Sequence, residues 1–223
     1  TGGISKKSWS MPYRVSVGYT GQEGILKGSD YKRVTAGFNI NPSLFDKHLN
    51  INVNGKYSYS KTNPGGQDAV GAAVSMDPTR PVKSSDETFK NWGGYWQWAL
   101  PTTSYDPTFP YNRNDDAPTN PVEKVENYDF YKSAHILLGN VEADYKIHGF
   151  EDLHLHANIA GEYSTGGEYN TNNPQSTYGF YYGGNSENKE KKYNVVATAY
   201  AQYTKDFNKA NHFDIMAGYE YSH

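Results

Sequence analysis

Apolar and polar positions alternate along two stretches near the end of the chain, residues 193–204 and 213–222, with a polar break between them. In the first stretch, small aliphatic residues lie between Tyr193 and Tyr203 on one face, and mostly polar residues occupy the other face. Alternation with a period of two indicates a β-strand that has one apolar and one polar side. The two stretches therefore predict an antiparallel hairpin.

The spacing of the two tyrosines predicts a membrane crossing. Tyr193 and Tyr203 are ten residues apart, which is about 33 Å at about 3.3 Å per residue. A strand of that length tilted by about 40° rises roughly 25 Å, the height of the lipid-facing band between the aromatic girdles of an outer-membrane barrel. A tyrosine suits each end of the band because its ring is apolar and its hydroxyl reaches water.

The same alternation recurs upstream and predicts five further strands, near residues 11–20, 31–41, 49–60, 133–145 and 153–163. Short turns alternate with longer connections, of which residues 61–132 and 164–192 are the two longest. This alternation of connection lengths is typical of outer-membrane barrels, with short periplasmic turns and long extracellular loops. We therefore expect an all-β fold: a segment of about seven strands from an antiparallel transmembrane β-barrel. Because an open edge in lipid is forbidden, further strands are expected outside this segment.

Composition fits this interpretation without requiring it. The mean hydropathy is -0.84, and no apolar run approaches the roughly 18 residues of a transmembrane helix. Tyr is far commoner than Phe, 21 against 9, as expected when many rings sit at a polar boundary. The net charge of -3 argues against a nucleic-acid partner, and the absence of Cys excludes disulfides and thiolate metal sites.

Several stretches resemble the SusC/RagA-type TonB-dependent outer-membrane transporters of Bacteroidetes. In chain order they are PYRVSVGY at 12–19, QEGILK at 22–27, DYKRVT at 30–35, AVGAAVSMDPTRPV at 69–82 and NPV at 120–122. The order and spacing of these stretches carry the resemblance, which covers most of the chain.

The resemblance implies a barrel of about 22 strands around an N-terminal plug. No plug is recognisable in residues 1–223, so we expect the chain to be a piece of barrel wall cut at both ends. The resemblance also implies localisation in the bacterial outer membrane, a SusD-like surface lipoprotein, the TonB complex acting through the missing plug region, and a cargo of oligosaccharide or peptide. It implies no cofactor.

An aromatic segment in the first long loop is the main candidate for ligand contact. It contains Trp92, Tyr95, Trp96 and Trp98 beside amide side chains. Such rings stack on sugars and are enriched at protein interfaces, so the segment is interpreted as a contact for substrate or for the lid lipoprotein. The alternative is a loop that packs its own small core. Tyr178, Tyr181 and Tyr182 in the second loop extend the candidate surface, with the same alternative.

Metal binding and catalysis are not expected. His154 and His156 share one face of a strand, but no further ligands with metal geometry accompany them, so we interpret them as polar lumen residues. Asp77, Asp115 and Asp116 are interpreted as solvated loop carboxylates. No phosphate loop or nucleophile–base arrangement is present in the sequence.

The sequence thus predicts part of a non-enzymatic transporter for active nutrient uptake, contributing barrel wall, lumen lining and surface loops. Two other functions stay open at this point. One is a passive outer-membrane porin without a plug. The other is a soluble β-sandwich that binds carbohydrate through its Trp/Tyr loop.

Overall fold

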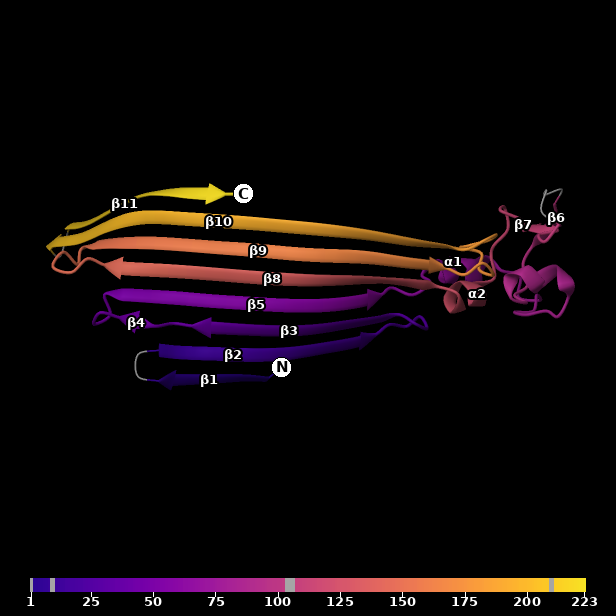
Figure 1. Ribbon diagram of the computed structural model, residues 1–223, viewed down its shortest axis with the longest axis horizontal. Helices are drawn as coiled ribbons and strands as arrows, with labels where there is room; N and C mark the ends of the chain where they lie inside the picture. Colours follow the sequence, from indigo (N-terminus) through magenta and orange to yellow (C-terminus); the bar gives the residue numbers. More distant parts are fainter. Residues whose placement is uncertain (1, 9–10, 103–106, 209–210) are drawn as a thin grey trace.

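The computed structural model describes residues 2–8, 11–102, 107–208 and 211–223. Its main element is one antiparallel sheet of nine strands, with eight in a continuous order and the short β4 (Ser43–Leu44) paired beside β5 (Figure 1). The eight strands, in sheet order, are β1 (Gly2–Ser8), β2 (Met11–Glu23), β3 (Asp30–Ile40), β5 (Leu49–Asn63), β8 (Asp129–Lys146), β9 (Leu153–Asn172), β10 (Gly184–Asn208) and β11 (Asn211–Ser222).

The remaining elements lie in the connection between β5 and β8. They gather at one end of the sheet, together with the short β9–β10 connection (Figure 1). They are α1 (Asp68–Ser75), the 3-10 helix η1 (Glu87–Trp92), β6 (Ala99–Pro101), β7 (Tyr111–Arg113) and α2 (Pro121–Glu126). None of the helices in the described ranges is both long and apolar enough to traverse a membrane.

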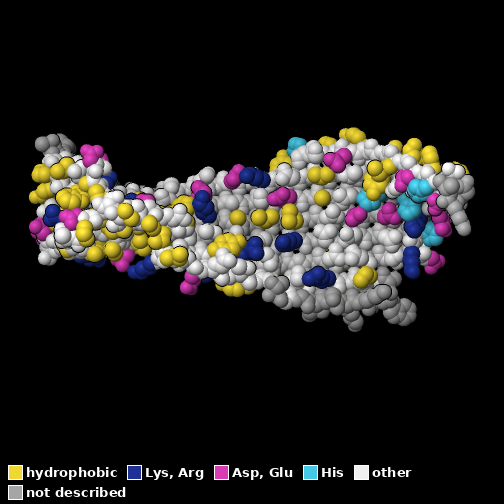
Figure 2. Space-filling view, turned by 180° about the vertical axis from the view of Figure 1, so that it is seen from behind, with side chains coloured by type: hydrophobic (Ala, Val, Ile, Leu, Met, Phe, Trp, Pro, Cys, Tyr) yellow, Lys and Arg dark blue, Asp and Glu magenta, His cyan; other side chains and the backbone are white. Residues whose placement is uncertain are grey.

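The strand register keeps apolar and polar residues on opposite faces of the sheet. One row across β5, β8, β9 and β10 consists of Ile51, Ala143, Ala157 and Ala199. The neighbouring row, which faces the other way, consists of Asn52, Glu142, Asn158 and Thr198. We call the first side the apolar face and the second the polar face. In Figure 2, backbone and uncharged, non-hydrophobic side chains, both white, cover most of the sheet surface, with charged side chains scattered among them.

The apolar face is not covered by another layer. Val17 is 57% exposed, Ile159 61% and Tyr193 61%. The other sheet in the described part of the chain is the two-stranded β6–β7 pair, far too small to cover this face. Among the residues that the structure describes, the buried apolar side chains are those of Ala69, Phe89, Trp92 and Tyr95, and all four lie in the β5–β8 connection. A soluble β-sandwich would bury its apolar sheet face against a second sheet, so the structure does not favour that alternative.

Two predicted loops are shorter than expected. β9 and β10 stay paired from Tyr203↔Leu153 up to Gly184↔Asn172, so the connection between them covers only residues 173–183, and 164–192 is not a long loop. Their upper halves are polar on both faces, which removes the alternation that marks a strand but leaves backbone pairing intact. The connection predicted at 61–132 likewise shortens to 64–128 and contains helices.

The strands also exceed the thickness of a membrane. β9 has 20 residues and β10 has 25, whereas about 9–11 tilted residues span a bilayer. Strand β1 was not predicted, since Gly2–Ser8 shows no alternation of apolar and polar residues.

Candidate functional site

Asn120 joins three parts of the structure at the end of the sheet. Residues 64–102, 107–128 and 173–183 form what we call the loop cap. Asn120 begins α2, and its side-chain oxygen accepts hydrogen bonds from the backbone N–H of Val122 (3.1 Å) and Glu123 (3.2 Å). Its Nδ2 donates to the carbonyls of Val82 (2.8 Å) and Trp96 (3.1 Å). One buried amide therefore fixes the start of α2, the Trp-rich segment at Trp96, and Val82, whose carbonyl also accepts a hydrogen bond from the Trp96 backbone.

Within the loop cap, Glu123 connects α2 to the β9–β10 connection. The residue is fully buried. Its carboxylate accepts from the backbone N–H of Thr177 at 3.0 Å, from the Thr177 hydroxyl at 2.6 Å and from Asn127 Nδ2 at 3.1 Å. A buried charge is tolerated only when its oxygens are hydrogen-bonded, and these three donors satisfy them. Residues that are 54 positions apart in sequence are thereby held together.

A second link runs from α1 to the same connection. Asp68 accepts a hydrogen bond from the Tyr178 hydroxyl (2.7 Å) and pairs with Lys124, whose ammonium lies 4.7 Å from the centre of the Tyr178 ring. Burial alone would raise the pKa of Asp68, but the hydrogen bonds from Lys124 and Tyr178 outweigh it and lower that pKa. Burial and the Asp68 carboxylate raise the pKa of Tyr178. Tyr178 is thus an internal anchor of the loop cap.

Tyr95 makes the third link, toward the β2–β3 turn. Its hydroxyl donates to Glu126, which also pairs with Lys27 at 3.0 Å. Burial and the neighbouring Glu126 raise the pKa of Tyr95 to about 12. The Tyr95 side chain is 6% exposed. It therefore contributes to loop packing in this structure and presents almost no surface to a ligand.

Trp92 is also part of the internal core of the loop cap. It is completely buried, and its ring centroid lies 5.0 Å from that of Phe180. Of the aromatic residues proposed from sequence, Trp92 and Tyr95 occupy the packed interior. Their position agrees with the alternative interpretation given above, in which the loop packs its own small core.

Trp96 and Trp98 lie closer to the surface and form an edge-to-face pair with centroids 4.9 Å apart. The Arg80 guanidinium carbon lies 5.2 Å from the Trp96 ring and 5.1 Å from the Trp98 ring, while Arg80 Nε donates to Asp77 at 3.2 Å. Sequence reasoning missed Arg80. In the sequence Arg80 stands between Thr79 and Pro81, and these neighbours give no indication that it contacts a residue sixteen positions later. Arg80, Trp96 and Trp98 together form an aromatic and cationic surface of the loop cap that is only partly buried.

Tyr181 and Tyr182 gather around a residue that the sequence did not single out, Phe109. The Phe109 ring contacts Tyr181 edge-on at 4.7 Å and Tyr182 at 5.4 Å. Tyr182 is 73% exposed. Of the seven predicted contact residues, Trp92 and Tyr95 are buried, and Tyr178 is half-buried and hydrogen-bonded to Asp68. We call the other four the accessible set: Trp96, Trp98 and Tyr181, which are half-buried, and Tyr182, which is exposed.

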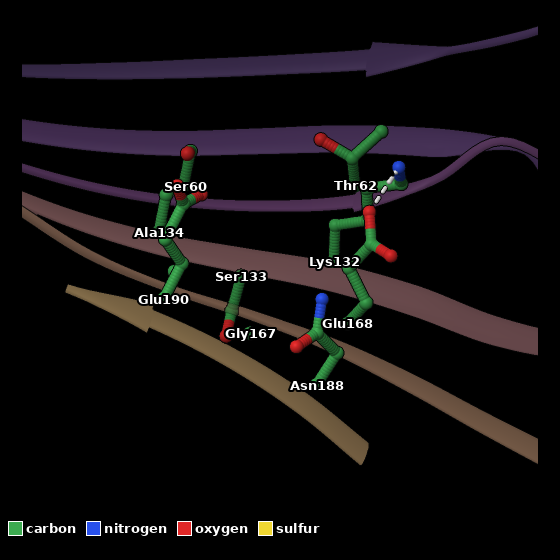
Figure 3. A pocket seen from close by; sticks show the side chains of 10 residues that line it. Ser60, Thr62, Lys132, Ser133, Ala134, Gly167, Glu168, Asn188 and Glu190 are labelled. Atoms are coloured by element: carbon green, nitrogen blue, oxygen red, sulfur yellow. Dashed lines mark hydrogen bonds and ion pairs between the residues drawn. The ribbon is translucent and has the colours of Figure 1, made fainter. Parts of the chain in front are cut away.

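A polar pocket of about 280 Å³ opens across β5, β8, β9 and β10 on the way to the loop cap (Figure 3). The pocket has room because two of the residues that line it, Ala134 and Gly166, have small side chains or none. Around them are hydroxyls, the Asn188 amide and the Lys132–Glu168 ion pair, whose N and O atoms are 2.5 Å apart. These groups supply hydrogen-bond donors and acceptors to a polar solute at the wall.

The two histidines proposed from sequence lie beside carboxylates, and two of the three loop aspartates, Asp77 and Asp115, pair with arginines. His154 Nδ1 lies 3.4 Å from Asp144, and His156 Nε2 lies 3.6 Å from Glu142. Asp115 pairs with Arg113 at 2.6 Å. Within the described residues, no group of three or more His, Cys, Asp or Glu side chains has a metal-binding arrangement.

An apolar groove of about 490 Å³ lies between the β2–β3 turn and the two helices. Leu26, Val70, Val122 and Val125 are among the residues that line it. Val70 is 55% exposed, and Val74, which follows it on α1, is 85% exposed. An exposed apolar patch with a hollow is typical of a surface that meets another protein.

The fold and the loop cap together define a class: a stretch of outer-membrane β-barrel wall with its surface loops, open at both edges of the sheet. No family model matches the chain. The chain is 41% identical over 216 residues to the TonB-dependent receptor SusC of Bacteroides thetaiotaomicron, a match that covers 96% of this chain and 21% of SusC.

The fold of the chain is also similar to that of solved structures. The RagAB peptide transporter superposes with a TM-score of 0.66 at 16% identity, covering 99% of this chain and 23% of the neighbour. The RagAB peptide importer in its open-open state gives the same TM-score at 17% identity. The resemblance predicted from sequence is confirmed: the chain matches a segment of SusC along nearly its whole length and shares its fold with the RagAB structures, and it spans about a fifth of the length of SusC.

Proposed function

We propose that this chain forms part of the wall and surface loops of a TonB-dependent outer-membrane transporter that takes up oligosaccharides or peptides. The observation that carries the proposal is the 41% identity to SusC over nearly the whole chain. The two-faced sheet supports it independently, because exposed Val17 and Ile159 on one face need lipid to cover them.

Each part of the chain then has a role. The apolar face meets the bilayer, and the polar face lines the path of the substrate. The loop cap lies on the extracellular side, as long loops do in this class of barrel. Movement of the substrate depends on TonB, acting through a plug region that belongs to another part of the protein. No covalent chemistry is required of the chain.

Ligand contact is assigned to the accessible aromatic set. Trp96 and Trp98 with Arg80 offer ring faces and a cation, and Tyr182 with Tyr181 offers phenol hydroxyls. Sugar rings and peptide side chains both bind such surfaces. A SusD-like lipoprotein is the proposed protein partner, and the apolar groove beside Val70 is the surface that suits it.

Energy dependence separates this function from a passive porin. In cells that carry the full-length protein, labelled oligosaccharide or peptide uptake is measured with TonB present and with TonB deleted, at equal outer-membrane levels of the protein. We expect uptake to cease without TonB. Uptake that continues unchanged in the deletion strain rejects active transport in favour of the porin.

The contact residues are tested by binding. Trp96→Ala removes the ring that contacts Trp98 and Arg80, and we expect substrate or lipoprotein affinity to fall about tenfold or more, as for a central aromatic contact. The control is Lys90→Gln on η1, whose lysine is exposed and pairs with Glu87. Unchanged affinity for both partners in the Trp96 variant, with normal membrane insertion, rejects the assignment and leaves Trp96 a packing role.

A further inference from the structure

Two lysines lie near a row of tyrosines on the apolar face, on the side of the loop cap. The tyrosine row is Tyr57, Tyr163 and Tyr193, aligned by the register across β5, β8, β9 and β10. Four residues nearer to the loop cap lie Lys61 on β5 and Lys189 on β10, in one row with Ser133 and Gly167 between them. The two cations thus lie in an outward-facing row two positions of the apolar face beyond the tyrosine row.

The two lysines flank a pair of stacked rings. Lys61 Nζ lies 4.1 Å from the centre of the Tyr131 ring, and the Tyr131 and Tyr169 rings stack with centroids 4.7 Å apart at 16°. Tyr169 folds over Gly167, where an added Cβ would come within 2.7 Å of its ring. Glycine at 167 therefore lets the ring lie flat against the sheet beside Lys189. We call Lys61, Tyr131, Tyr169 and Lys189 the lysine–tyrosine platform.

The platform carries positive charge that the protein only partly neutralises. Lys189 pairs with Glu187 at 2.8 Å, yet its side chain remains 61% exposed. Lys61 is exposed and makes no ion pair with a carboxylate in the part of the chain that the structure describes. Lys191, one step nearer to the tyrosine row, is also exposed and faces the same side. The platform therefore has room for an external anion.

The height of the platform points to the lipid headgroups. This step rests on the proposed function, which places the tyrosine row at the outer boundary of the hydrocarbon. Four residues of strand at about 3.3 Å each, tilted by about 40°, rise roughly 10 Å. The headgroup zone extends about 5–8 Å beyond the hydrocarbon, and a lysine side chain reaches down toward it from above.

We propose that the lysine–tyrosine platform binds a phosphorylated glycolipid of the outer leaflet. The ammonium groups of Lys61 and Lys189 pair with its phosphates, and the stacked tyrosines pack against a sugar ring. A zwitterionic phospholipid matches the net positive charge less well, because its own amine repels the lysines. Anionic lipid at this position would hold the wall at a fixed depth in the outer leaflet.

The test uses the full-length transporter that contains this chain, purified in detergent. The probe is a synthetic lipid-linked glucosamine disaccharide carrying two phosphates, and the comparison is the same lipid without phosphates; binding is measured by native mass spectrometry. We expect the phosphorylated lipid to bind at least about tenfold more tightly than the dephosphorylated one. Lys61→Gln with Lys189→Gln should remove about that factor.

The matched control is Arg14→Gln with Lys56→Gln, which removes the same charge from the polar face. It should bind the phosphorylated lipid as the wild type does. Equal binding of the two lipids by the wild type, or an equal loss in both double variants, overturns the platform. Membrane insertion is measured separately, by the change in gel mobility on heating. A protein that inserts but binds both lipids equally refutes the platform alone. A protein that never inserts refutes the proposed function as well.

Discussion

Placing an arginine at Ala199 tests which face of the sheet meets lipid. Ala199 lies on the apolar face between Ala157 and Tyr219, and it is exposed. It is six residues from Tyr193 and four from Tyr203, which is about 20 Å and 13 Å along the strand. The position is therefore close to the middle of the proposed bilayer.

The expected cost follows from that depth. An arginine facing lipid near the midplane of a barrel costs about 2–4 kcal/mol, which lowers the ratio of folded to unfolded protein roughly 30- to 700-fold. Thr198 is its natural control, because it is the adjacent residue on the polar face. There an arginine lies opposite Glu220 on β11 and Asn158 on β9, so we expect Thr198→Arg to cost less than about 1 kcal/mol.

The assay is urea unfolding of the full-length protein refolded into lipid vesicles, followed by tryptophan fluorescence. The midpoint should shift strongly for Ala199→Arg and little for Thr198→Arg. If the two variants unfold at the same urea concentration, or if Thr198→Arg is the less stable, the assignment of the apolar face to lipid is refuted.

Three further predictions concern the loop cap. Glu123→Gln replaces an acceptor of the Thr177 hydroxyl by a donor in a fully buried site, and should destabilise the 173–183 connection by about 1–3 kcal/mol, seen as faster hydrogen exchange there while the strands keep their protection. Because the pKa of Tyr95 is raised to about 12, its contribution to the free energy of unfolding is complete below about pH 10 and is lost as the pH rises toward 12. Tyr95→Phe should remove this decline in stability at alkaline pH. An unchanged decline contradicts the role given to the hydrogen bond between Tyr95 and Glu126. Trp92→Ala opens a cavity in the core of the loop cap and should cost about 3–5 kcal/mol in local stability, measured by proteolysis of the loops, without lowering outer-membrane insertion.

The strands near the tyrosine rows could be predicted from sequence because one face meets apolar surroundings and the other meets water. This contrast produces alternation with a period of two, in which Val195, Ala197 and Ala199 on one face alternate with polar residues such as Asn194 and Thr198 on the other. The upper part of the β9–β10 hairpin was missed for the same reason. Residues 184–192 have water on both sides, so nothing in their side chains distinguishes the two faces.

The arrangement of the loop cap was beyond sequence reasoning. Trp92 and Trp98 are the same residue type six positions apart, yet one is buried beneath Phe180 and the other stacks with Arg80 near the surface. The difference arises from partners far away in the chain, such as the contact between Glu123 and Thr177. Local composition records that an aromatic segment exists, but not which of its rings face inward.

Single-cysteine labelling along β9 tests the central claim, a wall with lipid on one side and water on the other, most directly. The chain contains no cysteine, so its residues 153–163 can be replaced one at a time, within the membrane, in a full-length protein from which any cysteine elsewhere has been removed. We expect a membrane-impermeant maleimide to label the even-numbered positions, beginning with His154 and His156, and to spare the odd-numbered positions such as Leu155 and Ile159. Labelling that is uniform along the strand, or that favours the odd positions, would contradict the account.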